Sequence, residues 1–337
     1  MRPMIDNMFS AGHRSDAGQS LESAVQNIAA TGLAEQVPAH AHTSKPCPRL
    51  AALLSAPPPD ARATPNLTAL VTKLGGFLDA VGTAEARKAS ETFNLVADYL
   101  GKPTASPAPT LLAAWMDATR TGLAALSPAQ AFPVVDLLRL GVLRPTVAQH
   151  WATQSDVLEG VFKALDSGMA GDAVANRPLR LTTHRLLINA LLSPAFATTA
   201  FMRMILDRVV VGALVADAVD ESAATLAFAC ARSSRAGSKR DEDLDVELAS
   251  GVAEALGRED LAPGVGASIA REFSDHSVLR LAATLGALVY LSPHAASLQE
   301  LLSALETPGK LDRHAARATA DQDELRSVCR EVRSLLA

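Results

Sequence analysis

Aromatic residues are scarce in this sequence, at 4% of the chain, although 48% of its residues are hydrophobic. Alanine and leucine supply most of that apolar content, and strand-forming residues occur only in isolated Val and Ile runs. Alanine and leucine lose little conformational freedom on entering a helix, so the composition predicts an all-α fold. The low aromatic content argues against a surface that stacks nucleotides or sugars.

Cysteine and basic charge are also in short supply. Cys47, Cys230 and Cys329 are too few and too scattered for a disulfide framework or a zinc site, which indicates a reducing compartment and no bound metal. The formal net charge is −5, so no global basic field exists to attract nucleic acid. The sequence therefore favours neither a nucleic-acid binder nor a secreted disulfide protein.

Long hydrophobic runs are missing as well. No window of about 18 apolar residues occurs, and the N-terminus lacks the apolar core of a signal peptide. The most apolar stretch, residues 201–219, is interrupted by four charged residues. We therefore expect no membrane partner and a cytoplasmic protein, with a nuclear location also compatible.

The chain divides by composition into two parts. Residues 1–59 are rich in polar residues and proline and end in Pro57-Pro58-Pro59, which predicts a mostly disordered leader. Within it we expect one helix inside residues 20–35 and a short apolar piece at 50–54. Residues 60–337 are predicted to form one helical domain.

Apolar residues at helical spacing run through the second part. Residues 67–81 carry them at i, i+3, i+4 and i+7, and Ser127-Pro128 provides a helix start. No alternating run long enough for a sheet occurs, which excludes the α/β enzyme folds. The further predicted helices are 86–100, 111–126, 132–143, 155–168, 178–192, 196–214, 219–233, 241–257, 262–273, 276–291, 295–305 and 318–336.

A proline step recurs along these helices. Four times an apolar helix ends in a short step to proline, at Pro103, Pro145, Pro194 and Pro293, giving intervals of 42, 49 and 99 residues. A recurrence of roughly 40 to 50 residues is typical of armadillo and HEAT-type arrays, in which helical units stack into a solenoid with a groove. The alternative is that helix-ending prolines fall regularly by chance.

Catalytic and cofactor motifs are hard to find. The histidines at 184, 276, 294 and 314 are isolated, and neither a nucleophile elbow nor a phosphate-binding loop is present. The sequence therefore predicts a protein that is not an enzyme and needs no cofactor.

Arginines on otherwise apolar helices are the most informative polar residues. Arg139 and Arg185 lie 46 residues apart, about one repeat, and Arg280 lies 95 residues further on. Arg185 and Asn189 share a helix face, as do Asp136 and Arg139. An arginine among leucines either pairs with an acid inside the fold, such as Asp136, or lines a groove that receives a carboxylate. The spacing leaves both readings open.

Four ordered segments resemble the PUL domain, which is found in phospholipase-activating protein and its fungal counterparts. The Phe-Pro-Val-Leu-Asp and Leu-Arg-Leu signature is similar to residues 132–140. Later family elements resemble Ala175-Asn176 with residues 185–189, residues 224–227, and residues 280–288. The chain departs from the family at Ala229, where members carry asparagine, and at residues 284 and 287, where Thr and Ala are interchanged.

The resemblance implies an armadillo-like α-solenoid of about six repeats. It also implies an adaptor that binds the acidic C-terminal tail of the valosin-containing AAA+ ATPase in ubiquitin-dependent protein degradation. The implied peptide-binding groove includes Arg139, Arg185, Asn189 and Arg280. Because the sequence shows no WD-repeat propeller or ubiquitin-binding segment, ubiquitin-pathway proteins are expected as indirect partners.

Two other functions stay open at this point. The helical rod could be a general scaffold for another acidic peptide. It could also be an accessory domain of a larger desumoylating or thiol enzyme, with the proline-rich leader as a linker.

Overall fold

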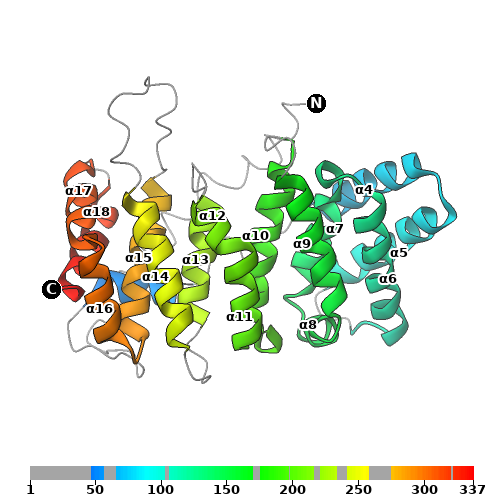
Figure 1. Ribbon diagram of the computed structural model, residues 1–337. Helices are drawn as coiled ribbons and strands as arrows, with labels where there is room; N and C mark the ends of the chain where they lie inside the picture. The colour runs from blue at the N-terminus through cyan, green and yellow to red at the C-terminus, as the bar shows by residue number, and fades with distance from the viewer. Residues whose placement is uncertain are drawn as a thin grey trace. The chain divides into compact units, whose positions relative to one another are not determined.

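The computed structural model describes residues 47–56, 66–102, 106–169, 175–196, 198–215, 221–233, 241–257, 275–319 and 322–337. Every regular element in these ranges is helical, so the predicted all-α class is confirmed (Figure 1). The chain forms two compact units. We call residues 60–198 the middle unit, and residues 1–59 together with 199–337 the split unit.

The middle unit is built of helices that pack against one another. Its most extensive packing joins α7 to α10 and α5 to α6, while α9 contacts α6, α7 and α10. Helix starts follow the local sequence: Asn66 and Thr83 each accept a hydrogen bond from a first-turn amide at 3.1 Å. The elements are α4 (Leu67–Val81), α5 (Ala84–Leu100), α6 (Pro109–Ala125), α7 (Pro128–Gly141), α8 (Pro145–Ala152), α9 (Ser155–Met169), α10 (Arg177–Leu191) and the 3₁₀ turn η2 (Pro194–Phe196).

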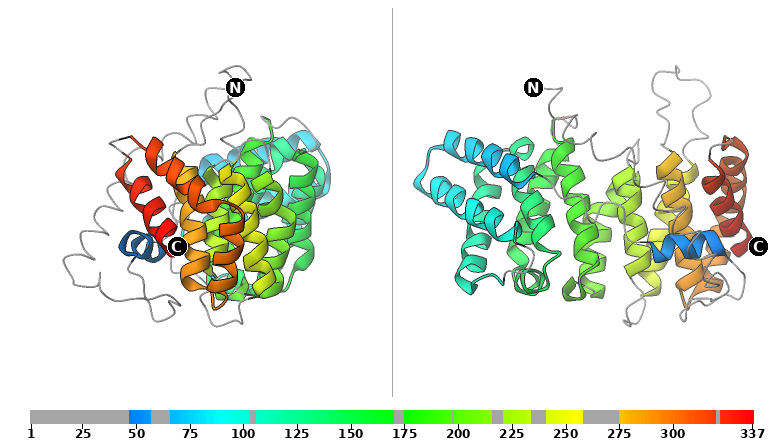
Figure 2. Two further views of the ribbon diagram at one scale, coloured as in Figure 1. Left: turned by 60° about the vertical axis from the view of Figure 1, so that its left-hand side comes forward. Right: turned by 180° about the vertical axis from the view of Figure 1, so that it is seen from behind.

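The split unit is organised around α15, which packs against α13, α14, α16, α18 and α3. The helix α3 comes from the N-terminal part of the chain and lies across α15 beside α18 (Figure 2, right). The elements are α3 (Pro48–Ser55), α11 (Thr199–Ile205), the π-helical η3 (Leu206–Val210), α12 (Val211–Val215), α13 (Glu221–Ser233), α14 (Glu242–Gly257), α15 (Asp275–Leu291), α16 (Ala295–Ala304), α17 (Thr307–Arg317) and α18 (Asp323–Leu335).

Helices α8 and α17 are not among the helices that the sequence predicts. Helix α8 begins at Pro145, although the recurring proline step predicts only the end of the preceding helix there. Proline fits the first turn of a helix, because the amide that it lacks has no partner there. Helix α17 begins at Thr307 with proline and glycine in its first turn and is largely polar, so apolar periodicity gives little sign of it.

Other boundaries also differ from the predictions. The predicted helix 196–214 is interrupted by the π-helical turn η3, and the predicted helix 318–336 begins only at Asp323. Helix α3 lies inside the predicted leader, so residues 48–55 are part of a folded unit. The predicted helices at 20–35 and 262–273 lie outside the described residues. None of the described helices is both long and apolar enough to cross a membrane.

Candidate peptide-binding surface

The signature segment 132–140 forms most of α7. Phe132 is buried, and the ammonium group of Lys73 on α4 lies 4.8 Å from its ring centroid. Arg139 is only 3% exposed, and its Nε donates a hydrogen bond to Oδ1 of Asp136 at 2.5 Å. This is the ion pair within one helix that the sequence left open as an alternative. Phe132 and Arg139 of the signature segment are therefore buried residues that pack within the fold.

Asn189 on α10 belongs to the same buried region. It is 1% exposed, and its Nδ2 donates a hydrogen bond to the main-chain carbonyl of Arg139 at 3.0 Å. That carbonyl lies in the last turn of α7, where main-chain carbonyls lack partners within the helix. Asn189 thus acts as a cap that α10 supplies to the C-terminal end of α7.

Arg185 differs from Arg139 in its exposure. It lies one turn before Asn189 on α10, and it is partly exposed while its neighbours His184 and Leu186 are buried. Arg139 and Asn189, by contrast, are buried and in direct contact with one another. Arg185 is the predicted site residue of this unit that solvent reaches most readily.

Arg280 occupies a comparable position on α15 of the split unit. From Ser277 to Leu291 it is the one residue that is not buried. Its guanidinium carbon lies 5.7 Å from the ring centroid of Phe228 on α13, a distance at which cation and ring attract one another. Arg280 is thus a partly exposed cation that an aromatic ring holds on an otherwise buried helix.

An acid of α18 shares the surroundings of Arg280. Burial raises the pKa of the Glu324 carboxyl, while the charges of Arg280, Arg49 and His276 act in the opposite direction. Glu324 is therefore an acid of the fold whose charge interacts with that of Arg280. Glu324, Arg49 and Phe228 carry no local signal that would predict this role, because only the fold brings them near Arg280.

The four predicted residues divide between the two units. Arg139, Arg185 and Asn189 belong to the middle unit, and Arg280 belongs to the split unit. A single groove that all four share therefore stays a prediction.

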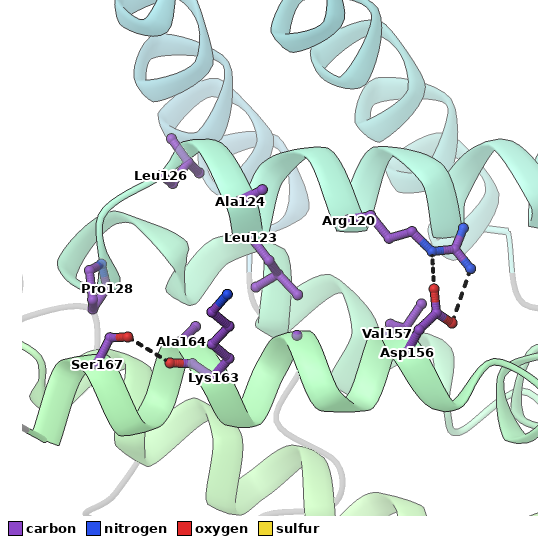
Figure 3. A pocket seen from close by; sticks show the side chains of 11 residues that line it. Arg120, Leu123, Ala124, Leu126, Pro128, Asp156, Val157, Lys163, Ala164 and Ser167 are labelled. Atoms are coloured by element: carbon purple, nitrogen blue, oxygen red, sulfur yellow. Dashed lines mark hydrogen bonds and ion pairs between the residues drawn. The ribbon is translucent and has the colours of Figure 1, made fainter.

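A separate pocket of about 460 Å³ lies between α6 and α9 (Figure 3). At one end Arg120 donates to both carboxylate oxygens of Asp156, at 2.5 and 3.2 Å, and also bonds Asp117 and Gln154. These bonds tie α6 to α9 and neutralise the guanidinium. The lining residues are Arg120, Leu123, Ala124, Leu126, Pro128, Asp156, Val157, Gly160, Lys163, Ala164 and Ser167, none of which is a predicted site residue.

The cysteines lack the surroundings of reactive thiols. All three are buried. Burial raises the pKa of the Cys230 thiol, and it raises the pKa of Cys329 to about 12. Since the thiolate is the nucleophile, neither residue is activated near neutral pH. Among the described residues no group of three or more His, Cys, Asp or Glu side chains is placed to hold a metal ion.

The sequence model of the PUL domain matches residues 61–331. The chain belongs to the PUL domain family. The PUL domain is a helical protein-interaction module. No curated protein matches the chain.

The family segments coincide with paired helices of this PUL domain. Residues 132–140 lie in α7 and residues 185–189 in α10, and these two helices pack extensively together. Residues 224–227 lie in α13 and residues 280–288 in α15, which form the second such pair. The matched region begins after α3.

Proposed function

We propose that this PUL domain is an adaptor that binds the acidic C-terminal tail of the valosin-containing AAA+ ATPase in ubiquitin-dependent protein degradation. Family membership over residues 61–331 carries the proposal. It places the chain among protein-interaction modules, and the resemblance of four helical segments points to this partner. The proposed sites of action are the cytoplasm and the nucleus.

Arg185 and Arg280 are the proposed direct contacts. Both are partly exposed on helices whose other residues are mostly buried. Arginine presents its donors in a planar fork that fits a carboxylate, and a partly desolvated arginine binds one more strongly than an arginine in bulk water does. An acidic tail with a free terminal carboxylate offers several such acceptors.

Arg139 and Asn189 have a supporting role in this proposal. Arg139 bonds Asp136 on its own helix, and Asn189 bonds the carbonyl of Arg139. The second contact joins α7 to α10, the helix that carries Arg185, and the first holds the Arg139 side chain within α7. We infer that these two residues shape the surface while Arg185 meets the peptide.

The proposed role is binding and not catalysis. Cys47, Cys230 and Cys329 are buried, and the pKa values of the last two are raised, which supports a chain without thiol chemistry of its own. The proposal accordingly assigns no catalytic residue, metal or cofactor.

Fluorescence anisotropy with a labelled ATPase-tail peptide tests the proposal on the full chain. We expect binding that weakens with added salt, because screening reduces attraction between exposed charges. Arg185→Ala and Arg280→Ala should each lower the affinity by a factor of about 10 or more, within the energy of a charged hydrogen bond. Arg330→Ala, which removes an exposed arginine of α18, is the matched control and should leave the affinity unchanged.

Two outcomes would count against this assignment. Unchanged affinity in both arginine variants would remove Arg185 and Arg280 from the site. Equal affinity for a scrambled peptide of the same charge would show that the domain binds acidic peptides in general and does not recognise the ATPase tail specifically.

A further inference from the structure

Helix α3 is too short to be stable by itself, and the split unit holds it in place. An isolated helix shorter than about 12 residues is marginal in water. The leucines at positions i, i+3 and i+4 of α3, Leu50, Leu53 and Leu54, are at most 2% exposed. They form its buried face against α15 and α18. Tertiary contacts therefore maintain this helix.

A carboxylate of α18 caps the start of α3. The two oxygens of Glu331 accept hydrogen bonds from the amides of Arg49 at 3.1 Å and Leu50 at 2.9 Å. The N-cap residue Cys47 makes no side-chain cap. First-turn amides lack hydrogen-bond acceptors within the helix and carry partial positive charge. A carboxylate supplies both the acceptor atoms and the opposite charge. Here that acid lies about 280 residues away in sequence.

A glycine of α15 makes room for the first leucine of α3. A Cβ atom at Gly286 would lie 2.8 Å from the Leu50 side chain and 2.7 Å from that of Val332 on α18. Real Cβ atoms do not approach other atoms so closely, so any larger residue at this position would force the Leu50 or Val332 side chain to shift. The surface is thus shaped for a leucine at this position.

The end of α3 is held by a cation. Arg232 of α13 donates a hydrogen bond from Nη1 to the carbonyl of Ala56, the residue that follows α3. The last carbonyls of a helix lack partners and carry partial negative charge, so a guanidinium matches them. The acid Glu331, the slot over Gly286 and the cation Arg232 together match the start, middle and end of one short helix.

All three recognition elements lie within the matched PUL domain, residues 61–331, and α3 lies outside it. We propose that this surface is a docking site for a short amphipathic helix and that α3 is its intramolecular ligand. The partner class is a helix of about two turns with leucines at i, i+3 and i+4. This inference does not depend on whether the domain binds the ATPase tail.

Covalent attachment explains why α3 occupies the site in the intact chain. A tethered ligand is present at an effective concentration in the millimolar range, far above that of any free peptide. A free α3 helix therefore binds only after the attached copy has been released. The site is then detectable as an exchange of one helix for another.

The test uses the full chain and a labelled peptide with the sequence of residues 47–56. In the variant Leu53→Asp with Leu54→Asp, burial of the attached helix would place two carboxylates in an apolar face, so α3 is expected to undock. The peptide should bind this variant at least tenfold more tightly than the unaltered chain. Glu331→Gln in the same background should weaken peptide binding, because an amide is a poorer helix cap than a carboxylate.

A peptide with Leu50→Asp is the matched control and should not bind. If the undocked variant keeps its helical circular dichroism but captures no peptide, the proposal is overturned. Hydrogen exchange of the unaltered chain covers the case in which that variant does not fold. The α3 amides should exchange faster than those of α15, because α3 can undock while the rest of the split unit stays folded. If the amides of both helices exchange only when the whole unit unfolds, the proposal is also overturned.

Discussion

The side-chain amide of Asn189 donates a hydrogen bond to the main-chain carbonyl of Arg139, across 3.0 Å and 50 positions of sequence. Two residues that the sequence marked as peptide ligands are therefore joined to one another. The contact links the last turn of α7 to α10 inside the middle unit. The acceptor is a main-chain carbonyl, so the contact gives the Asn189 side chain a structural role without requiring that it touch a peptide.

Replacing Asn189 with alanine should destabilise the middle unit. The substitution leaves the buried carbonyl of Arg139 without this donor, and an unsatisfied buried polar group costs about 1–3 kcal/mol. Urea unfolding followed by circular dichroism measures the loss. Asn94→Ala is the control: Asn94 makes a similar bond to the Ser90 carbonyl at 3.0 Å but is exposed, so its removal should cost far less. Equal losses in the two variants would contradict the capping role.

Arg139→Ala should lower stability more than it lowers peptide affinity. The Asp136 and Arg139 side chains are 16% and 4% exposed, and removing one partner of a buried ion pair costs about 3–5 kcal/mol. Replacing both residues, with Asp136→Leu and Arg139→Met, should recover most of that stability because no buried charge remains unpaired. If the double variant is stable but fails to bind the ATPase tail, Arg139 contacts the peptide directly.

The fold class and most helices could be predicted because they depend on local signals. Helix α4 follows the predicted range 67–81. Ser127 and Pro128 start α7 as predicted, although four residues earlier than its apolar pattern suggests. Helix α3 was not expected to be ordered, because its N-terminal cap, Glu331, comes from α18 at the far end of the sequence. Non-local capping leaves no local signature.

The candidate site was predictable only in part. The spacing places Arg139 and Arg185 about one repeat apart, and the two residues lie on α7 and α10, which pack together. It could not separate a buried arginine, such as Arg139, from a partly exposed one, such as Arg185, because both stand among leucines. Exposure depends on which helices cover each face, and that is a property of the packing.

Gly141→Ala should destabilise the middle unit, whereas Gly76→Ala should stabilise it. A Cβ at Gly141, the last residue of α7, would lie 2.2 Å from the Trp115 ring of α6. Such overpacking costs about 1–3 kcal/mol. At Gly76 in α4 nothing lies within 4 Å, so alanine should add about 0.5–1 kcal/mol by its higher helix propensity. Thermal unfolding of both variants measures the difference, and shifts in the same direction would contradict the packing of α6 against α7.

Glu324→Gln should stabilise the split unit at neutral pH. Burial raises the pKa of Glu324 above its ordinary value of 4.5, so the fold favours the protonated carboxyl. That contribution is fully present below pH 4.5 and is lost as the pH rises through the folded-state pKa. Glutamine stays neutral at every pH. The gain in the free energy of unfolding of the variant should therefore be largest at neutral pH and should vanish below pH 4.5. Urea unfolding of both proteins between acidic and neutral pH measures this gain.

The same substitution should strengthen binding of the acidic tail. Glu324 and Arg280 lie close enough for their charges to interact, so glutamine removes the internal acid with which a peptide carboxylate must compete. We expect the affinity for the labelled tail peptide to rise severalfold, with most of the gain at low salt. Asp323→Asn is the control, because Asp323 is exposed at the start of the same helix and bonds Arg326. A gain of equal size in this control would reduce the effect to net charge, and no gain in Glu324→Gln would remove Arg280 from the peptide surface.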